Sequence, residues 1–175
     1  MISSAASKIR SFVVNSKGSF YHHFESKEQF GVELLKRYVA EASAYKHRIL
    51  LSTEPEPNAR DRLLTLLQSN IGNFLENNGK CQCLVVKLAS EIANFSEPMR
   101  EVLAQGHEDW AKIMTSVIRE GIENGQIADT VDPERSARVL GNLWMGAMQH
   151  AMIAHSAEPL RGALKFISND LIPAP

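Results

Sequence analysis

The chain has 175 residues, of which 44% are hydrophobic and 22% are charged, and its formal net charge at pH 7 is −1. This size and composition are typical of one soluble globular domain, or of a small module attached to a larger one. The near-zero net charge argues against a protein that coats nucleic acid. It does not exclude a local basic region, and the first 24 residues contain Lys8, Arg10 and Lys17 without any acidic residue.

The search for targeting signals and the number of cysteines together indicate the cellular compartment of the protein. No apolar run reaches the roughly 20 residues that a membrane-spanning helix needs. The opening sequence, MISSAASKIRSFVV, lacks the apolar region of a signal peptide. The two cysteines, Cys81 and Cys83, lie too close together for a scaffold disulfide, and a reducing compartment suits them. We therefore predict a cytoplasmic protein.

The hydrophobic pattern has helical periodicity nearly throughout, without strand alternation or internal repeats, and it predicts an all-α protein. The first long helix starts at Ser26, where SKEQ has the form of a capping box, and runs to about Leu51. Proline in the first turn and a glycine C-cap at Gly125 help to delimit the later helices. These helices are predicted at residues 60–77, 83–93, 96–124, 132–156 and 158–172.

The densest motif is KGSFYHHFESKEQF, which runs from Lys17 to Phe30. A short helix joined by a tight corner to a capped helix is what a DNA-reading unit needs, and a helix N-terminus favours a phosphate. On the other interpretation Phe20 and Phe24 are core residues and the histidines are merely exposed, and the residue types alone favour neither. The candidates for DNA contact are Lys17, Gly18, Ser19, Tyr21, His22 and Lys27.

This motif resembles the end of the helix-turn-helix and the start of the fourth helix in TetR-family repressors. In that family a Tyr-x-x-Phe block is followed by Ser-Lys-Glu, and the matching positions here are Tyr21–Phe24 and Ser26–Glu28. Two further segments, GKCQCLVVKLASEIANFSEPMREVL and LGNLWMGAMQHAMIAHSAEPLRGAL, resemble helices of a branch that senses electrophiles and oxidants. The resemblance covers residues 17–172.

The resemblance implies a TetR-like all-α fold in two parts. Residues 1–25 would form a partial helix-turn-helix DNA-binding region, and residues 26–175 would form a ligand-binding and dimerisation domain. The implied protein is a repressor and not an enzyme, and it needs no cofactor. Its implied partners are palindromic double-stranded operator DNA, a second copy of the chain, and a small-molecule or electrophile inducer that releases it from the operator.

The residues upstream of the motif depart from the family pattern. Only MISSAASKIRSFVVNS precedes the predicted recognition helix, so the first helix of the DNA-binding unit is predicted to be missing. The alternative prediction is therefore a truncated family member that dimerises and binds a ligand but does not bind DNA.

A second motif is Cys81-Gln82-Cys83 followed by Lys87, which predicts a sensor site. Cys83 and Lys87 are four residues apart and would share a helix face, where an ammonium group and a helix N-terminus both favour a reactive thiolate. In the resemblance, Cys83 falls where the electrophile-sensing branch carries a cysteine. The alternatives are small buried hydrophobic side chains, or a small helical enzyme that uses Cys83. No His or Cys follows at zinc-finger spacing, so no metal site is predicted.

Large, soft side chains on several helices are predicted to line a ligand pocket, although such residues are also typical of plain core. The pocket residues are predicted from the family resemblance: Phe74, Val86, Trp110, Met114, Trp144, Met148 and Met152.

The last two helices carry more apolar surface than one small bundle can bury, which indicates a partner interface. In the family these two helices form a four-helix bundle across a two-fold axis. The predicted interface residues are Val139, Leu143, Ala147, Ala151, Leu164, Phe166, Ile167 and Leu171.

Overall fold

The computed structural model describes residues 24–54, 56, 58–81 and 83–175, and in these residues every regular element is a helix. The elements are α3 (Lys27–Leu50), α4 (Ala59–Glu76), α5 (Leu84–Phe95), α6 (Glu97–Glu123), α7 (Pro133–Ala154), α8 (Glu158–Phe166) and η1 (Ile167–Leu171). The all-α prediction is confirmed. No helix in this part of the chain is long and apolar enough to cross a membrane.

Local capping signals account for where the helices begin. Ser26 is the N-cap of α3, and its hydroxyl accepts a 3.0 Å hydrogen bond from the Gln29 N–H. The Gln29 side chain reaches back to the N–H of Glu25 rather than to that of Ser26, at 2.6 Å. Asn58, Ser96 and Asp132 cap α4, α6 and α7 in the same way. These polar caps satisfy N–H groups that have no partner within the helix.

The ends of the helices depart from the prediction in one place. The continuous helix predicted over residues 158–172 is α-helical only to Phe166 and then widens into the π-helical turn η1. The N–H of Ile172 bonds to the carbonyl of Ile167, five residues back, at 2.9 Å. Gly125 has φ +66°, as expected for a glycine that ends a helix.

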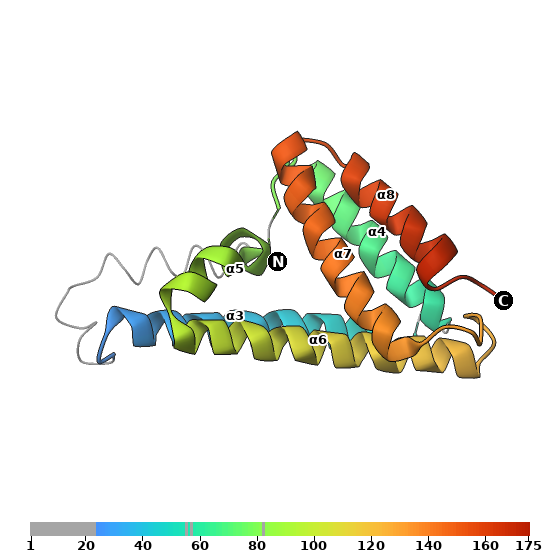
Figure 1. Cartoon of the computed structure of the whole chain (residues 1–175), viewed down its shortest axis with the longest axis horizontal. Coiled ribbons are helices and arrows are strands. Elements are labelled where there is room, and N and C mark those ends of the chain that lie inside the picture. The colour runs from blue at the N-terminus through green and yellow to red at the C-terminus, as the bar shows by residue number, and fades with distance from the viewer. Residues whose placement is uncertain (1–23, 55, 57, 82) are drawn as a thin grey trace.

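The long helices α3 and α6 lie side by side along the molecule, while α4, α7 and α8 pack together towards one end (Figure 1). Gly106 of α6 faces Val39 of α3, and a Cβ at Gly106 would lie 2.6 Å from Val39 Cγ1. The absence of a side chain at Gly106 therefore sets how closely the two long helices approach.

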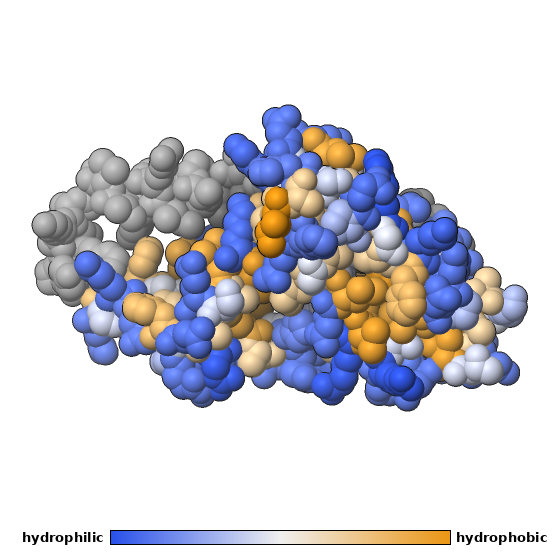
Figure 2. Space-filling view, turned by 45° about the horizontal axis from the view of Figure 1, so that its top comes forward, coloured by the Kyte–Doolittle hydropathy of each residue, from blue (hydrophilic) through white to orange (hydrophobic). Residues whose placement is uncertain are grey.

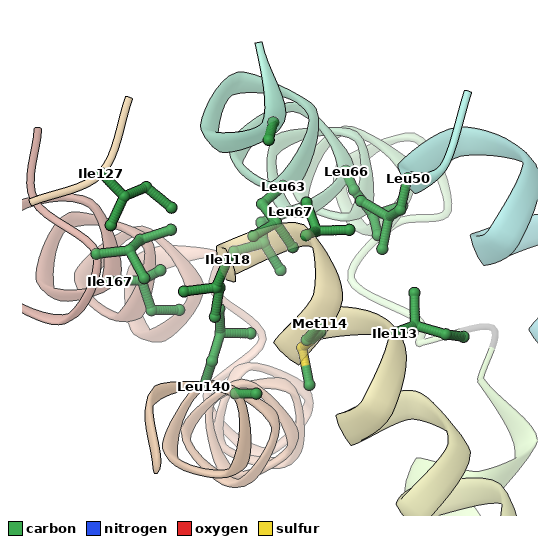
Figure 3. Close-up of a cluster of buried hydrophobic side chains, with 14 residues drawn as sticks. Leu50, Leu63, Leu66, Leu67, Ile113, Met114, Ile118, Ile127, Leu140 and Ile167 are labelled. Carbon is green, nitrogen blue, oxygen red and sulfur yellow. The ribbon is translucent and has the colours of Figure 1, made fainter. Parts of the chain in front are cut away.

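A large hydrophobic core joins one end of α3 to the C-terminal elements. Figure 3 shows Leu63 and Leu67 of α4 facing Ile118 of α6, with Ile167 of η1 beside them. A second cluster is formed by residues of α4, α5, α7 and α8 and of the connections before α5 and α8: Ile71, Phe74, Cys81, Val86, Ala147, Met148, Ala151, Ala157, Leu160 and Ala163. Cys81 thus belongs to the core, and the second cluster lies directly beneath the loop that carries Cys83.

Candidate functional site

Cys83 is the N-cap of α5 and is half-buried, whereas the neighbouring Cys81 is only 1% exposed. The sequence predicted Cys83 within the first helical turn, but α5 begins one residue later, at Leu84, and Cys83 has extended backbone with φ −77° and ψ 114°. The side chain of Cys83 makes no capping hydrogen bond. Cys83 therefore occupies the N-cap position, and its thiol lies at the positive end of α5 without accepting a hydrogen bond from the helix N–H groups.

Tyr38 of α3 contacts the start of α5, and no pattern in the sequence indicates this contact. Its hydroxyl oxygen accepts a 2.9 Å hydrogen bond from the Leu84 N–H, one residue after Cys83. Burial raises the pKa of Tyr38 above its ordinary value of 10.0, and a thiolate at Cys83 would act in the same direction. The phenol is therefore protonated at neutral pH.

Lys46, two helical turns after Tyr38, is the second residue near the thiol that the sequence did not indicate. Its ammonium nitrogen lies 4.2 Å from the centre of the Trp110 ring, a cation–π contact. Burial lowers the pKa of Lys46, and a thiolate at Cys83 would act in the opposite direction. The Lys46 ammonium is therefore within electrostatic range of the candidate sensor thiol.

Cys83 has Cys81 as a neighbour in addition to Lys87, whose N–H donates a 3.3 Å backbone hydrogen bond to the Cys83 carbonyl. Burial raises the pKa of the Cys81 thiol, while a hydrogen bond from the Cys83 N–H and the charge of Lys87 act in the opposite direction. The Cys83 N–H lies 3.3 Å from Cys81 Sγ. Cys81 thus has the inert character of a buried thiol, and Cys83 is the accessible one.

The seven residues predicted to line a ligand pocket are divided between the two clusters. Phe74, Val86 and Met148 are buried in the second cluster, with Met152 packed against it. Trp110 and Met114 instead line a cavity of about 90 Å³ between α6 and α7. The seventh residue, Trp144, contacts both clusters.

The indole nitrogen of Trp144, Nε1, is a buried polar atom without a hydrogen-bond partner in the described part of the chain. No other buried side-chain nitrogen or oxygen in this part of the chain lacks one. An unpaired buried donor costs about 1–3 kcal/mol. A ligand with an acceptor atom could recover this cost.

The residues predicted to form the dimer interface differ in exposure. Val139 is 38% and Phe166 47% exposed, whereas Ala151 and Ile167 are fully buried within the single chain. Leu143, Leu164 and Leu171 are half-buried and Ala147 is 9% exposed. Ile153, which is 78% exposed on α7, has a larger free surface than any of these. Figure 2 shows exposed hydrophobic area on the right-hand half of the molecule, where α7 and α8 lie.

Most of the predicted DNA contacts lie outside the described residues, namely Lys17, Gly18, Ser19, Tyr21 and His22. Lys27 is exposed as the first residue of α3. Phe24 is half-buried and meets Phe30 edge to face, with ring centres 4.9 Å apart. No group of three or more His, Cys, Asp or Glu residues in the described ranges could hold a metal ion.

Comparison with known proteins places this arrangement in a family. Residues 59–167 match the family described as tetracyclin repressor-like, C-terminal domain. The chain is 38% identical over 154 residues to the HTH-type transcriptional repressor NemR of Escherichia coli K12, covering 87% of this chain and 76% of NemR. It is 30% identical over 158 residues to the HTH-type transcriptional repressor DhaR of Mycobacterium sp. strain GP1, covering 90% and 77%.

Solved structures agree with these matches. The crystal structure of E. coli NemR in its reduced form superposes with a TM-score of 0.83 at 36% identity, covering 91% of this chain and 81% of NemR. A regulatory protein TetR from Rhodobacter sphaeroides shares the fold, with a TM-score of 0.77 at 24% identity and coverage of 87% and 79%. The fold is that of a helical transcription regulator. The chain belongs to the TetR family of transcriptional repressors.

Proposed function

We propose that this chain is a homodimeric DNA-binding repressor that leaves its operator when Cys83 is modified by an electrophile or an oxidant. The observation that carries this proposal is the half-buried Cys83 thiol at the N-terminus of α5, beside Tyr38 and Lys46. The likeness to NemR, whose matched structure is a reduced form, supports a redox-responsive thiol.

DNA binding is assigned to residues 1–25 together with Lys27. Both relatives are HTH-type repressors, which supports a helix-turn-helix in this region. A two-fold dimer presents a pair of recognition helices and therefore suits a palindromic operator. Helix α3 begins immediately after this region and also carries Tyr38 and Lys46, so one helix links the proposed DNA-binding region to the sensor.

Dimerisation is assigned to the exposed surface of α7 and α8. Val139, Gly146 and Ile153 are spaced seven residues apart on α7 and are all exposed. A Cβ at Gly146 or at Gly162 of α8 would meet no atom within 4 Å, so both glycines leave the helix surface open to a close neighbour. Apolar residues interleaved with small ones allow two helices to pack tightly, and Phe166 extends this surface on α8.

A non-covalent inducer is a second candidate signal, favoured by the unpaired Nε1 of Trp144. This donor lies between the two clusters that contain the predicted pocket residues. A ligand would act as an inducer only if it bound the DNA-free arrangement more tightly than the DNA-bound one.

The test is a mobility-shift assay with DNA from upstream of the chain's own gene, with and without limiting N-ethylmaleimide. We expect the unmodified dimer to retard the DNA and the reagent to release it. Cys83→Ser should bind DNA and resist release, whereas the matched control Cys81→Ser should still respond. Release of Cys83→Ser would contradict the sensor assignment. Absence of a shift at low salt with folded dimer would contradict the assignment as a DNA-binding repressor.

A further inference from the structure

Helix α5 starts without a cap of its own. The first N–H groups of a helix have no partner within it, and an N-cap side chain usually supplies one. At the N-cap position of α5, Cys83 makes no such bond. The Leu84 N–H is satisfied instead by Tyr38 Oη, 46 residues earlier in the chain, at 2.9 Å. The tie between α3 and the start of α5 therefore runs through a single phenol.

The same phenol lies beside Cys83, the residue immediately before Leu84, and the side chain of Cys83 contributes to the raised pKa of Tyr38. A tyrosine hydroxyl has one proton to donate and lone pairs that accept. Because its oxygen accepts from the Leu84 N–H, its proton is free to point at the sulfur. The charged or titratable groups that interact with Cys83 are Tyr38 and Lys46 from α3 and Cys81 from its own segment, and Lys87 acts on Cys81. Tyr38 is the one among them whose side chain is hydrogen-bonded to the backbone of α5, at the residue next to Cys83.

The opposite end of α5 is tied to α3 as well. Ser96, which follows Phe95 and is 3% exposed, donates a 2.6 Å hydrogen bond from Oγ to Glu28 Oε1. Glu28 is in the first turn of α3, whereas Tyr38 lies ten residues further along the same helix. Helix α5 is thus attached to α3 at both ends, and only the attachment at Tyr38 lies next to Cys83.

We propose that Tyr38 is the positioning residue of the sensor: its hydroxyl holds the Cys83 sulfur in place for attack, and it releases the start of α5 once the sulfur has reacted. This inference rests on the proposed function of Cys83. It explains how a reaction at the Cys83 sulfur would release the N-terminal end of α5 from α3.

With N-ethylmaleimide as the electrophile, the chemistry is a conjugate addition. The sulfur forms a bond to one alkene carbon, the alkene π bond breaks, and the other carbon takes up a proton in place of the one that the thiol loses. The product is a thioether, whose sulfur is a much weaker hydrogen-bond acceptor than the thiolate that attacks. The added ring also occupies space beside the sulfur. Both effects displace the Tyr38 hydroxyl and leave the Leu84 N–H without its partner.

The first experiment measures the rate at which N-ethylmaleimide labels Cys83, by intact-protein mass spectrometry in a Cys81→Ser background. We expect Tyr38→Phe, which removes only the hydroxyl, to slow labelling about fivefold to tenfold, the factor that corresponds to one hydrogen bond. Tyr45→Phe is the matched control, because Tyr45 is on the same helix and 44% exposed, and it should label at the unaltered rate. Labelling of Tyr38→Phe that is as fast as in the control would overturn the positioning role.

The second experiment separates positioning from general support of the fold by measuring amide hydrogen exchange of Leu84. Exchange should accelerate about fivefold to tenfold in Tyr38→Phe and by a similar factor in the Cys83 adduct of the unaltered chain. Labelling Tyr38→Phe should then add little further, because the tie is already broken. Additive effects would overturn the release step. Failure of Cys83→Ser to resist release from DNA would instead refute the sensor function, and it would leave these two measurements unaffected.

Discussion

Arg62 and Glu120 form a partly buried ion pair that joins α4 to α6, with 2.6 Å between Arg62 Nη2 and Glu120 Oε2. The Arg62 side chain is 2% exposed, and the same guanidinium donates to the carbonyls of Leu50 and Glu56. One side chain therefore holds together the end of α3, the following connection and the middle of the bundle.

Arg62→Ala should lower the free energy of unfolding by about 3–5 kcal/mol, because it leaves buried acceptors without their donor. Arg119→Ala is the control, since Arg119 pairs with Glu134 on the surface, where both side chains are more than half exposed. That pair should contribute less than about 1 kcal/mol. Urea unfolding of both variants checks the prediction, and equal losses would show that burial does not set the strength of these pairs.

The hydroxyl of Ser96 takes part in two hydrogen bonds. It donates to Glu28, and it caps the N-terminus of α6 by accepting from the Met99 N–H at 3.4 Å. Ser96→Ala should therefore cost about 1–2 kcal/mol of stability. A double-mutant cycle with Glu28→Ala isolates the bond between the two side chains, with an expected coupling of about 1 kcal/mol. A coupling near zero in thermal unfolding would mean that the 2.6 Å contact does not stabilise the protein.

Two glycines within helices should respond to alanine in opposite directions. A Cβ at Gly121 of α6 would lie 2.7 Å from Ile127 Cδ1, so Gly121→Ala should destabilise by about 1–3 kcal/mol through overpacking. A Cβ at Gly72 of α4 would meet nothing within 4 Å. Gly72→Ala should therefore stabilise by about 0.5–1 kcal/mol. Melting temperatures that shift in the same direction would contradict this reading of the packing.

Features encoded by neighbouring residues could be predicted from the sequence. Ser26, Ser96 and Asp132 each precede a helix that starts as predicted, because an N-cap acts on N–H groups two or three residues away. The end of α8 could not be predicted, since the pattern of apolar residues does not distinguish an α-helix from the wider turn at Ile167–Leu171.

Only some of the residues that surround Cys83 could be predicted from the sequence. Cys83 was identifiable by its residue type and by resemblance, but the phenol and ammonium beside it are contributed by a helix about 40 residues earlier. The helical spacing of Tyr38 with Leu34 and Leu35 indicates that Tyr38 faces inward, but not what it meets there. Lys87 is predicted beside Cys83 because the two residues are four apart in the sequence, and folding adds Tyr38 and Lys46, which no local pattern indicates.

The pH dependence of stability should contain a contribution from Cys81. Burial raises the pKa of its thiol above the ordinary value of 9.0, so the folded chain keeps this proton at a pH where the unfolded chain has lost it. The contribution is fully present below pH 9 and is lost as the pH rises further, by at most about 1.4 kcal/mol per unit. Cys81→Ala should therefore lose less stability than the unaltered chain between pH 8 and pH 10.

The control for this measurement is Ile71→Val in the same cluster. It removes one methylene without a titratable group and should cost about 0.5–1.5 kcal/mol. That loss should be equal at both pH values, when each is measured by urea unfolding. A pH slope for Cys81→Ala equal to that of the unaltered chain would contradict the assignment to the thiol.

Charge placed on the exposed surface of α7 should separate the proposed dimer without unfolding the chain. Ile153 is 78% exposed in the single chain, so Ile153→Glu removes no intramolecular core contact, but it would bury an unpaired carboxylate in a helix-to-helix interface. We expect a monomer by sedimentation equilibrium, with the helical circular dichroism unchanged. Phe95→Glu is the matched control, since Phe95 is 80% exposed on α5, away from α7 and α8, and it should remain dimeric. If Ile153→Glu stayed dimeric while Phe95→Glu became monomeric, the interface would have to be assigned to α5 instead.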